Sequence, residues 1–168
     1  MIDGEYIGDA HMDEKDIQYV LGRHLFREKI CIPNVSMYCP GKTEYEADFI
    51  YFDLNTQYLT EVEIKTDIHD FRRDFKKKRY HDCKNVKYLY YAMPSCVYDE
   101  YREEINNMLG DAGLIIIDET DTDSYSGNLL RFGGFVKRAK ARDDWYELSP
   151  TGLMHYLRIG CMKWVNHR

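Results

Sequence analysis

The spacing of hydrophobic and polar residues changes several times along the chain, and each change predicts a new element. In some segments apolar residues recur at helical spacing, and in others they alternate with polar residues or form short continuous runs, which separates helices from strands. Asp13 and Asp67 are placed to act as N-caps of two of the helices. The expected elements are helices at about 13–28, 67–80, 98–109 and 149–165, and strands at about 30–39, 47–52, 58–66, 88–93, 114–117 and 128–132.

This order of elements predicts an α/β fold with a mixed central β-sheet flanked by helices. A chain of 168 residues that is 44% hydrophobic suits a single domain over 1–168. No apolar run is long enough to cross a membrane, and no glycine-rich dinucleotide or P-loop motif is present. The five cysteines show no paired spacing and the first residues are acidic and polar, so we expect a cytoplasmic protein with reduced thiols.

The charge of the chain is unevenly distributed. A net charge of -6 argues against a protein that coats nucleic acid through its whole surface, because phosphate attraction requires positive charge. The helix predicted over 67–80 is nevertheless rich in basic residues, and we expect it to contact the DNA backbone. The residues expected at this contact are Arg72, Arg73, Lys76, Lys77, Lys78 and Tyr80. The alternative is that the charge run is a solvated helix face.

A predicted hairpin between the strands at 47–52 and 58–66 brings acidic residues together. If the turn consists of Asn55 and Thr56, paired residue numbers sum to 111 and Asp48 lies opposite Glu63. Alternation then separates a polar face from an apolar one. The polar face is expected to carry Glu46, Asp48, Ile50, Glu61, Glu63 and Lys65, and the apolar face Ala47, Phe49, Tyr51, Val62 and Ile64.

Directly opposed carboxylates destabilise a sheet unless a cation lies between them, and Mg²⁺ or Mn²⁺ would serve. Asp48, Glu63 and the backbone carbonyl of Ile64 are the predicted metal ligands. Lys65, on the same face as Glu63, would position the attacking water and offset charge on the phosphate. The [DE]xK spacing occurs four times in the chain, so strand context and the upstream Asp48 distinguish this copy. The alternative is a solvated sheet face on which Lys65 pairs with Glu46.

Five short fragments, taken in order, carry a resemblance to a known family. They are EADFI at 46–50, EVEIKT at 61–66, DFRRD at 70–74, YLYYAMP at 88–94 and AGLIIID at 112–118. Together they resemble the MmcB-like DNA-repair proteins of the PD-(D/E)XK nuclease superfamily. The resemblance implies a restriction-endonuclease-like core and a divalent-metal-dependent nuclease acting on DNA in repair or processing. Its catalytic residues would be Asp48, Glu63 and Lys65, and Glu28 or Glu46 would be the candidates for a further acidic ligand.

Two other functions remain open at this point. A protein of this fold could bind DNA or regulate other proteins after losing cleavage activity, and a structural interaction module would do neither. If the protein cuts both strands of a duplex, two active sites are generally needed, which makes a homodimer the expected assembly.

Overall fold

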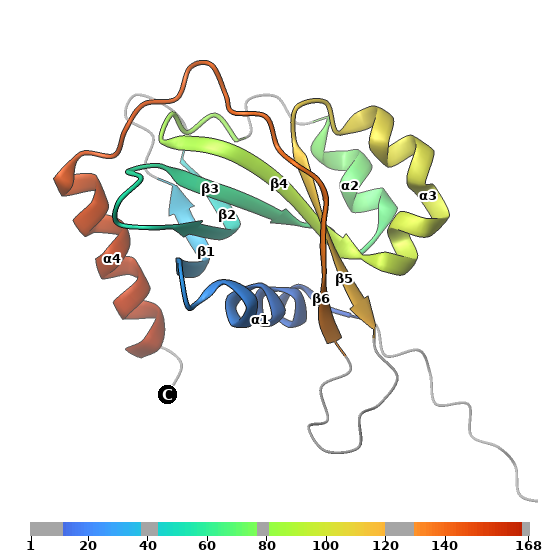
Figure 1. Cartoon of the computed structure of the whole chain (residues 1–168), viewed down its shortest axis with the longest axis horizontal. Coiled ribbons are helices and arrows are strands. Elements are labelled where there is room, and N and C mark those ends of the chain that lie inside the picture. Colours follow the sequence, from blue (N-terminus) through green and yellow to red (C-terminus); the bar gives the residue numbers. More distant parts are fainter. Residues whose placement is uncertain (1–11, 38–43, 77–80, 120–129, 166–168) are drawn as a thin grey trace, which may run out of the picture.

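The computed structural model describes residues 12–37, 44–76, 81–119 and 130–165, and Figure 1 shows its architecture. Six strands form one sheet in which each strand lies beside its neighbours in sequence. Strands β3, β4 and β5 run parallel, and the other neighbouring strands are antiparallel. The strands are β1 (Ile30–Met37), β2 (Tyr45–Phe52), β3 (Leu59–Ile64), β4 (Val86–Pro94), β5 (Gly113–Glu119) and β6 (Leu130–Lys137), and the helices are α1 (Glu14–Leu25), α2 (Ile68–Asp74), α3 (Ser95–Met108) and α4 (Pro150–Val165). The predicted α/β fold with a mixed sheet flanked by helices is therefore confirmed.

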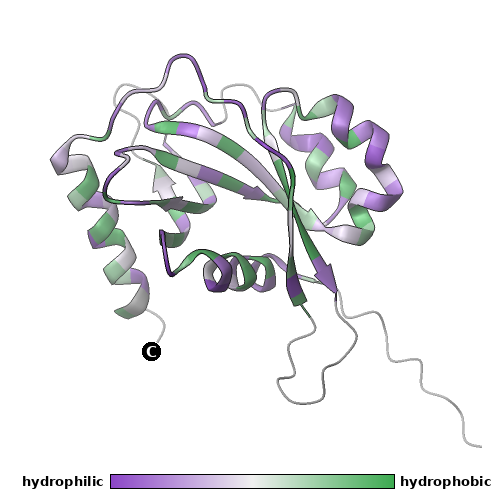
Figure 2. Ribbon diagram, viewed as in Figure 1, coloured by the Kyte–Doolittle hydropathy of each residue, from purple (hydrophilic) through white to green (hydrophobic). Residues whose placement is uncertain are grey.

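Helices cover both faces of this sheet (Figure 1). Ile17 and Leu21 of α1 pack on the face that carries Val62 and Ile64 of β3. On the opposite face, α2 and α3 pack against β4 and β5 at one end, and α4 packs at the other end. Figure 2 shows hydrophobic and hydrophilic residues alternating along α1 and α3, and hydrophilic residues also interrupt the central strands β3 and β4. That alternation is expected of helices that bury one side only.

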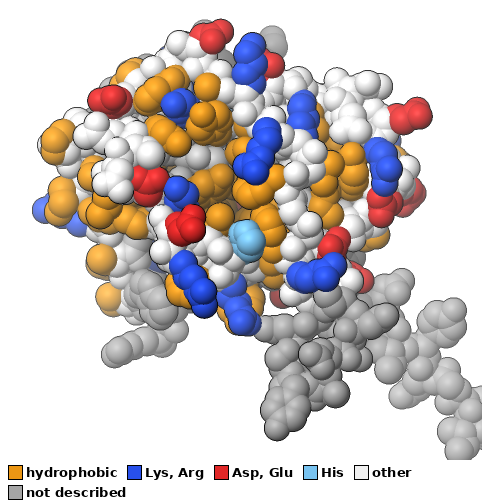
Figure 3. Space-filling view, in the orientation of Figure 1, with side chains coloured by type: hydrophobic (Ala, Val, Ile, Leu, Met, Phe, Trp, Pro, Cys, Tyr) orange, Lys and Arg blue, Asp and Glu red, His pale blue; other side chains and the backbone are white. Residues whose placement is uncertain are grey.

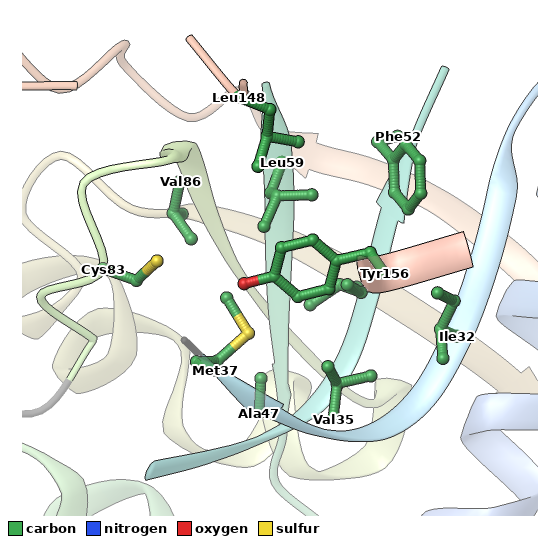
Figure 4. Close-up of a cluster of buried hydrophobic side chains, with 11 residues drawn as sticks. Ile32, Val35, Met37, Ala47, Phe52, Leu59, Cys83, Val86, Leu148 and Tyr156 are labelled. Atoms are coloured by element: carbon green, nitrogen blue, oxygen red, sulfur yellow. The ribbon is translucent and has the colours of Figure 1, made fainter. Parts of the chain in front are cut away.

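Tyr156 holds α4 against the sheet and is 1% exposed. Figure 4 shows its ring surrounded by side chains of β1, β2 and β3, among them Ile32, Phe52 and Leu59. The rings of Phe52 and Tyr156 meet edge to face, with centroids 6.5 Å apart. Burying a large apolar side chain stabilises a fold by roughly 1.5–3 kcal/mol. We call Tyr156 and the buried side chains around it the Tyr156 cluster: Ile32, Val35, Met37, Ala47, Ile50, Phe52, Leu59, Cys83, Val86 and Leu148.

Several helix boundaries lie where the sequence predicts them. The side chains of Asp13 and Asp67 each accept a hydrogen bond of 2.9 Å from the backbone N–H three residues later, as N-caps do. Pro150 is the first residue of α4, where its missing N–H costs nothing. Gly110 follows α3 with a φ of +55°, a conformation that glycine adopts without strain. α1 is shorter than predicted, since it ends at Leu25 rather than near residue 28.

The helix predicted over 67–80 is also shorter in the structure. Ile68 and Phe71 are buried as expected, but Phe75 is 41% exposed, so the buried stripe ends after the second turn. The helix ends with it, because a short helix depends on tertiary packing for its stability. Residues 77–80 lie outside the described part of the chain.

The connection between β2 and β3 differs from the predicted two-residue turn, yet the register is the predicted one. Residues 53–58 form a longer loop, in which the Asp53 carboxylate accepts hydrogen bonds from the N–H groups of Asn55 and Thr56. Such side-chain acceptors stabilise turns that have no regular hairpin geometry. The observed pairs, each summing to 111, are Phe49 with Val62, Ile50 with Glu61, and Tyr51 with Thr60.

The alternation of side chains shifts where β1 and β2 pass under α1. Asn34 has a φ of +49°, and Gln18 of α1 donates to the Asn34 side-chain oxygen at 2.6 Å and to the Asp48 carbonyl at 2.9 Å. As a result Ala47 packs in the Tyr156 cluster together with Ile50, and its prediction on the opposite face was wrong. The other predicted members of that face do share the cluster beneath α1, namely Phe49, Tyr51, Val62 and Ile64.

The tight contact between β4 and β5 gives a stability test. A Cβ atom added at Gly113 would lie 2.3 Å from the Tyr90 ring and 2.8 Å from the backbone nitrogen of Ala139. We therefore expect Gly113→Ala to lower the free energy of unfolding by about 1–3 kcal/mol in urea denaturation. Gly22→Ala is the matched control, because nothing lies within 4 Å of that Cβ in the middle of α1. It should raise stability by about 0.5–1 kcal/mol, and equal effects of the two changes would contradict this packing.

Candidate active site

Charged side chains are buried on the face of the sheet that carries α2, α3 and α4. Glu61 and Glu63 of β3 are both 0% exposed. Glu61 pairs with Ile50 of the Tyr156 cluster, and Glu63 pairs with Tyr91, which packs against α2 and α3. The two glutamates therefore lie between two apolar regions. With three further side chains that are at most 9% exposed they form what we call the polar cluster: Glu61, Glu63, Lys65, Asp74 and His81.

Lys65 joins β3 to α2. Its Nζ lies 3.3 Å from Glu63 Oε2, 3.3 Å from Asp74 Oδ1 and 3.7 Å from Asp70 Oδ2. Asp67 caps α2 two residues after Lys65, so the first turns of the helix bring their carboxylates back over the lysine. The residue is only 4% exposed, and the alternative prediction of a solvated sheet face is therefore wrong for this side chain.

His81 closes the cluster from the loop before β4. Its Nδ1 lies 2.5 Å from Glu61 Oε1, and its Nε2 lies 3.1 Å from Asp74 Oδ2. The backbone has a φ of +60°, a conformation that costs free energy in any residue but glycine. Arg142 donates a hydrogen bond of 2.6 Å to the His81 carbonyl and helps to hold it there. The surrounding contacts thus fix the imidazole between two carboxylates.

Two tyrosines fix the outer carboxylate oxygens of the cluster. The Tyr45 hydroxyl donates to Glu61 Oε2 at 2.7 Å, and the Tyr91 hydroxyl donates to Asp74 Oδ2 at 3.0 Å. Glu63 Oε1, in contrast, is buried without a hydrogen-bond partner. A buried carboxylate oxygen left in this state is costly, and native structures usually satisfy such an atom with a protein group, an ordered water or an ion.

Asp48 approaches the cluster from β2. Its Oδ2 accepts a hydrogen bond of 2.8 Å from the N–H of Ile64, just beyond the last backbone pair between β2 and β3. Burial raises the pKa of Asp48, and the Ile64 N–H and Lys65 partly offset that rise. A side-chain hydrogen bond with the Glu63 carboxyl acts on the same pKa. The structure therefore brings Asp48, Glu63 and Lys65 together. Ile64 contacts Asp48 through its backbone N–H, whereas its backbone carbonyl was the predicted metal ligand.

Glu14, in the first turn of α1, is an acidic neighbour that the sequence prediction missed. Its pKa is raised by burial first and then by the charge of Asp48, and Lys65 opposes this rise. Gln18 and Asn34 both donate hydrogen bonds to its Oε1. Glu28, the predicted helical candidate, is exposed in the turn after the other end of α1. Glu14, at the start of α1, is thus the upstream acidic residue whose pKa responds to the charges of Asp48 and Lys65. The signal in the sequence was that Glu14 lies four residues before Gln18, so that both side chains share one side of α1.

Glu46, the other candidate for a further acidic ligand, is an exposed residue of β2. Its charge acts on the pKa of Glu14, so it lies toward α1.

The electrostatics of the polar cluster follow from its burial. Burial raises the pKa of Glu63 to about 8, and neighbouring carboxylates add to the rise although His81 opposes it. Burial alone would lower the pKa of His81, but hydrogen bonds with Asp74 and Glu61 outweigh it and raise that pKa to about 9. The carboxyl groups in contact are those of Asp48, Glu61, Glu63 and Asp74, and the cationic groups that face them are Lys65 and His81. Among the described residues the acids are in excess, and protons or a cation must balance them.

Of the basic residues predicted to contact DNA, one described residue is held within the protein and two are exposed. Arg72 forms two hydrogen bonds with Glu104 of α3, at 2.6 and 2.7 Å, so its guanidinium is tied to the protein. Arg73 pairs with Asp70 but remains 70% exposed, and Lys76 is exposed. Lys77, Lys78 and Tyr80 lie outside the described residues. In the view of Figure 3 the described Lys and Arg side chains are dispersed among hydrophobic and acidic ones and form no continuous basic patch.

A cavity of about 330 Å³ lies apart from the polar cluster and shares no residue with it. It is bordered by four tyrosines, at 51, 58, 88 and 90, and by Lys29 and Arg138. Tyr51 and Tyr90 belong to the side of the sheet that α1 covers, whereas Glu61 and Glu63 face α2. We therefore identify the candidate site by its buried charges rather than by this hollow.

Comparison of the sequence with protein-family models and with curated proteins gave no match. None of the described helices combines the length and the apolar composition that crossing a membrane requires.

The buried lysine gives a second stability test. In Lys65→Met the carboxylates of Glu63 and Asp74 lose a cation while remaining buried, so the free energy of unfolding should fall by about 3 kcal/mol or more in urea. Lys76→Met removes the same charge at an exposed position and should change stability by no more than about 0.5 kcal/mol. A Lys65 variant as stable as the Lys76 variant would show that the buried pairs do not hold the cluster together.

Proposed function

We propose that the protein is a divalent-metal-dependent nuclease with a PD-(D/E)XK core that hydrolyses phosphodiester bonds of DNA in repair or processing. One observation carries the proposal: Asp48 and Glu63 interact beside the amine of Lys65, at the point where β2 and β3 stop pairing. The resemblance in five ordered sequence fragments supports the assignment to DNA.

The donor set fits a hard divalent cation such as Mg²⁺ or Mn²⁺. Asp48 and Glu63 offer carboxylate oxygens, and Glu63 Oε1 is buried without a hydrogen-bond partner. These two side chains, with the carbonyl of Ile64, would hold the ion, and Glu14 or Glu46 would be the further acidic neighbours. When bound, the ion would supply Lewis-acid stabilisation of the phosphate charge and a more acidic water.

The residues of the chain have separable tasks in this proposal. Asp48 is oriented by the Ile64 N–H, so its second oxygen is available toward Glu63. Lys65 is fixed by Glu63 and Asp74, and its ammonium would position the attacking water and stabilise negative charge on the phosphate. The exposed Arg73 of α2 and Lys76 in the turn after it would contact the DNA backbone.

The second candidate is a protein that binds DNA or regulates a partner but no longer cleaves. A specific observation favours it, because Lys65 is already engaged by Glu63, Asp74 and Asp70 within the protein. Arg72 is likewise engaged by Glu104. In this case the ion pairs would be structural and the protein would retain affinity for DNA without forming a cleaved product.

Conversion of supercoiled plasmid to nicked or linear DNA tests the proposal. The purified chain should produce cleaved DNA with Mn²⁺ and none after chelation. Asp48→Asn keeps the size and one acceptor oxygen of the side chain and should lower the rate by about 10²–10⁴-fold, as should Lys65→Ala. Asp99→Asn makes the same chemical change on the surface of α3 and should leave the rate unchanged.

Circular dichroism of each variant separates lost chemistry from lost folding. Retained DNA binding in a gel-shift assay with no metal-dependent product would instead support the second candidate. Two cuts in one binding event would support the expected homodimer, whereas single nicks would argue for one active site.

A further inference from the structure

We infer that Glu61, Glu63 and His81 form a binding site for a divalent transition-metal ion, distinct in its ligands from the Asp48 and Glu63 position. One ligand atom from each residue lies within 4.8 Å of the other two. The site shares Glu63 with the proposed cleavage site, but it requires only the contacts described here and does not depend on the protein being a nuclease.

Each of the three side chains has an inner atom that faces the other two residues and an outer atom that faces away from them. The inner atoms, Glu61 Oε1, Glu63 Oε1 and His81 Nδ1, converge, since Nδ1 lies 2.5 Å from the first and 3.7 Å from the second. Ligand atoms bound at about 2.1 Å to one ion lie roughly 3 Å apart, and the two separations bracket that value. These two separations are close to those around a bound ion, and one ligand atom of each residue lies within 4.8 Å of the other two.

Each outer atom of the three side chains already has a partner outside the three residues. Tyr45 donates to Glu61 Oε2, and Lys65 donates to Glu63 Oε2. Asp74 Oδ2 faces His81 Nε2 at 3.1 Å. Carboxylate contacts of this kind orient metal-binding histidines in proteins and leave the other ring nitrogen for the ion. The three inner atoms thus face one another, and an ion bound by them would replace the proton that His81 Nδ1 and Glu61 Oε1 share.

The state of Glu63 Oε1 supports a bound ion independently of the clustering of acids. Glu63 is 0% exposed, and its Oε1 is buried without a hydrogen-bond partner while it points toward His81 Nδ1. An ion between them would satisfy this atom directly. The positive φ of His81, maintained by Arg142, is a further cost that a binding site would explain.

The ligand types select the class of ion. Mg²⁺ and Ca²⁺ prefer ligand sets made of oxygen, whereas imidazole nitrogen suits ions such as Mn²⁺, Fe²⁺, Co²⁺ or Zn²⁺. Two carboxylates with one histidine therefore favour a first-row transition ion over Mg²⁺ at this position. Asp48 and Glu63 alone have no such preference, because both are oxygen donors.

Titration of the chelator-treated chain with MnCl₂, in the absence of nucleic acid, tests this site. We expect calorimetry to detect Mn²⁺ binding that an equal concentration of MgCl₂ does not displace. Pulsed electron paramagnetic resonance of the Mn²⁺ complex should show coupling to a ¹⁴N nucleus, which reports a histidine ligand directly. His81→Gln should abolish the coupling and weaken binding by roughly 100-fold or more, and Asp74→Asn should weaken it by about 10–100-fold.

His69→Gln is the matched control, because His69 is an exposed histidine of α2 and should leave both signals unchanged. Glu61→Gln keeps the size of the side chain and its acceptor for Tyr45, so it tests the ligand without opening a cavity. Absence of Mn²⁺ binding, absence of ¹⁴N coupling in the unmodified chain, or full coupling in His81→Gln would each overturn the inference. Plasmid cleavage is measured separately, so a protein that binds Mn²⁺ through His81 but does not cleave DNA would contradict only the proposed nuclease function.

Discussion

The structure depends on the balance of charge among side chains that are buried between two apolar regions of one sheet face. Glu61, Glu63 and Asp74 are almost completely removed from water, and Lys65 and His81 lie among them. Removing an ion from water costs several kcal/mol, and only close opposite charges and hydrogen bonds offset that cost. The contacts of both cations are accordingly divided between β3 and the carboxylates of α2, with Asp74 shared by the two. The position of this short helix is thus coupled to the charge state of the strand beneath it.

The fold supplies these contacts through three features, one local in sequence and two that join distant segments. Asp67 caps α2 immediately after β3, so the chain reverses over Lys65 and brings Asp70 and Asp74 toward it. Gln18 of α1 bonds both neighbouring strands at the point where their alternation shifts, which sets the direction of Asp48. The strands β2 and β3 stop pairing at that point, and the Asp48 carboxylate takes the Ile64 N–H instead. A side chain thereby replaces a backbone partner and comes close to Glu63.

The sequence was sufficient for features that depend on neighbouring residues. Caps at Asp13 and Asp67 and the register that places Ile50 opposite Glu61 were all predicted, because each follows from local hydrogen bonding or from the period of a strand. Predictions failed where distant segments meet. The shift of Ala47 arises from a contact between α1 and two strands, which no spacing within β2 could indicate. The place of His81 in the cluster could not be predicted, since its partners Glu61 and Asp74 are brought to it only by the packing of α2 on the sheet.

Strand β3 itself shows why the polar cluster is more than a consequence of folding. Every residue of the strand is buried, and a strand covered on both faces is ordinarily an almost continuous apolar run. Glu61 and Glu63 break that rule at two adjacent positions of one face, where leucine or isoleucine would fill the same space without a desolvation cost. Replacing buried ion groups by apolar side chains is often neutral or stabilising, so stability alone gives no reason to keep them. Disagreement between a buried environment and a charged residue is expected where function, rather than packing, determines the side chain. The two glutamates, and the histidine and lysine that neutralise them, are therefore explained better by chemistry than by packing.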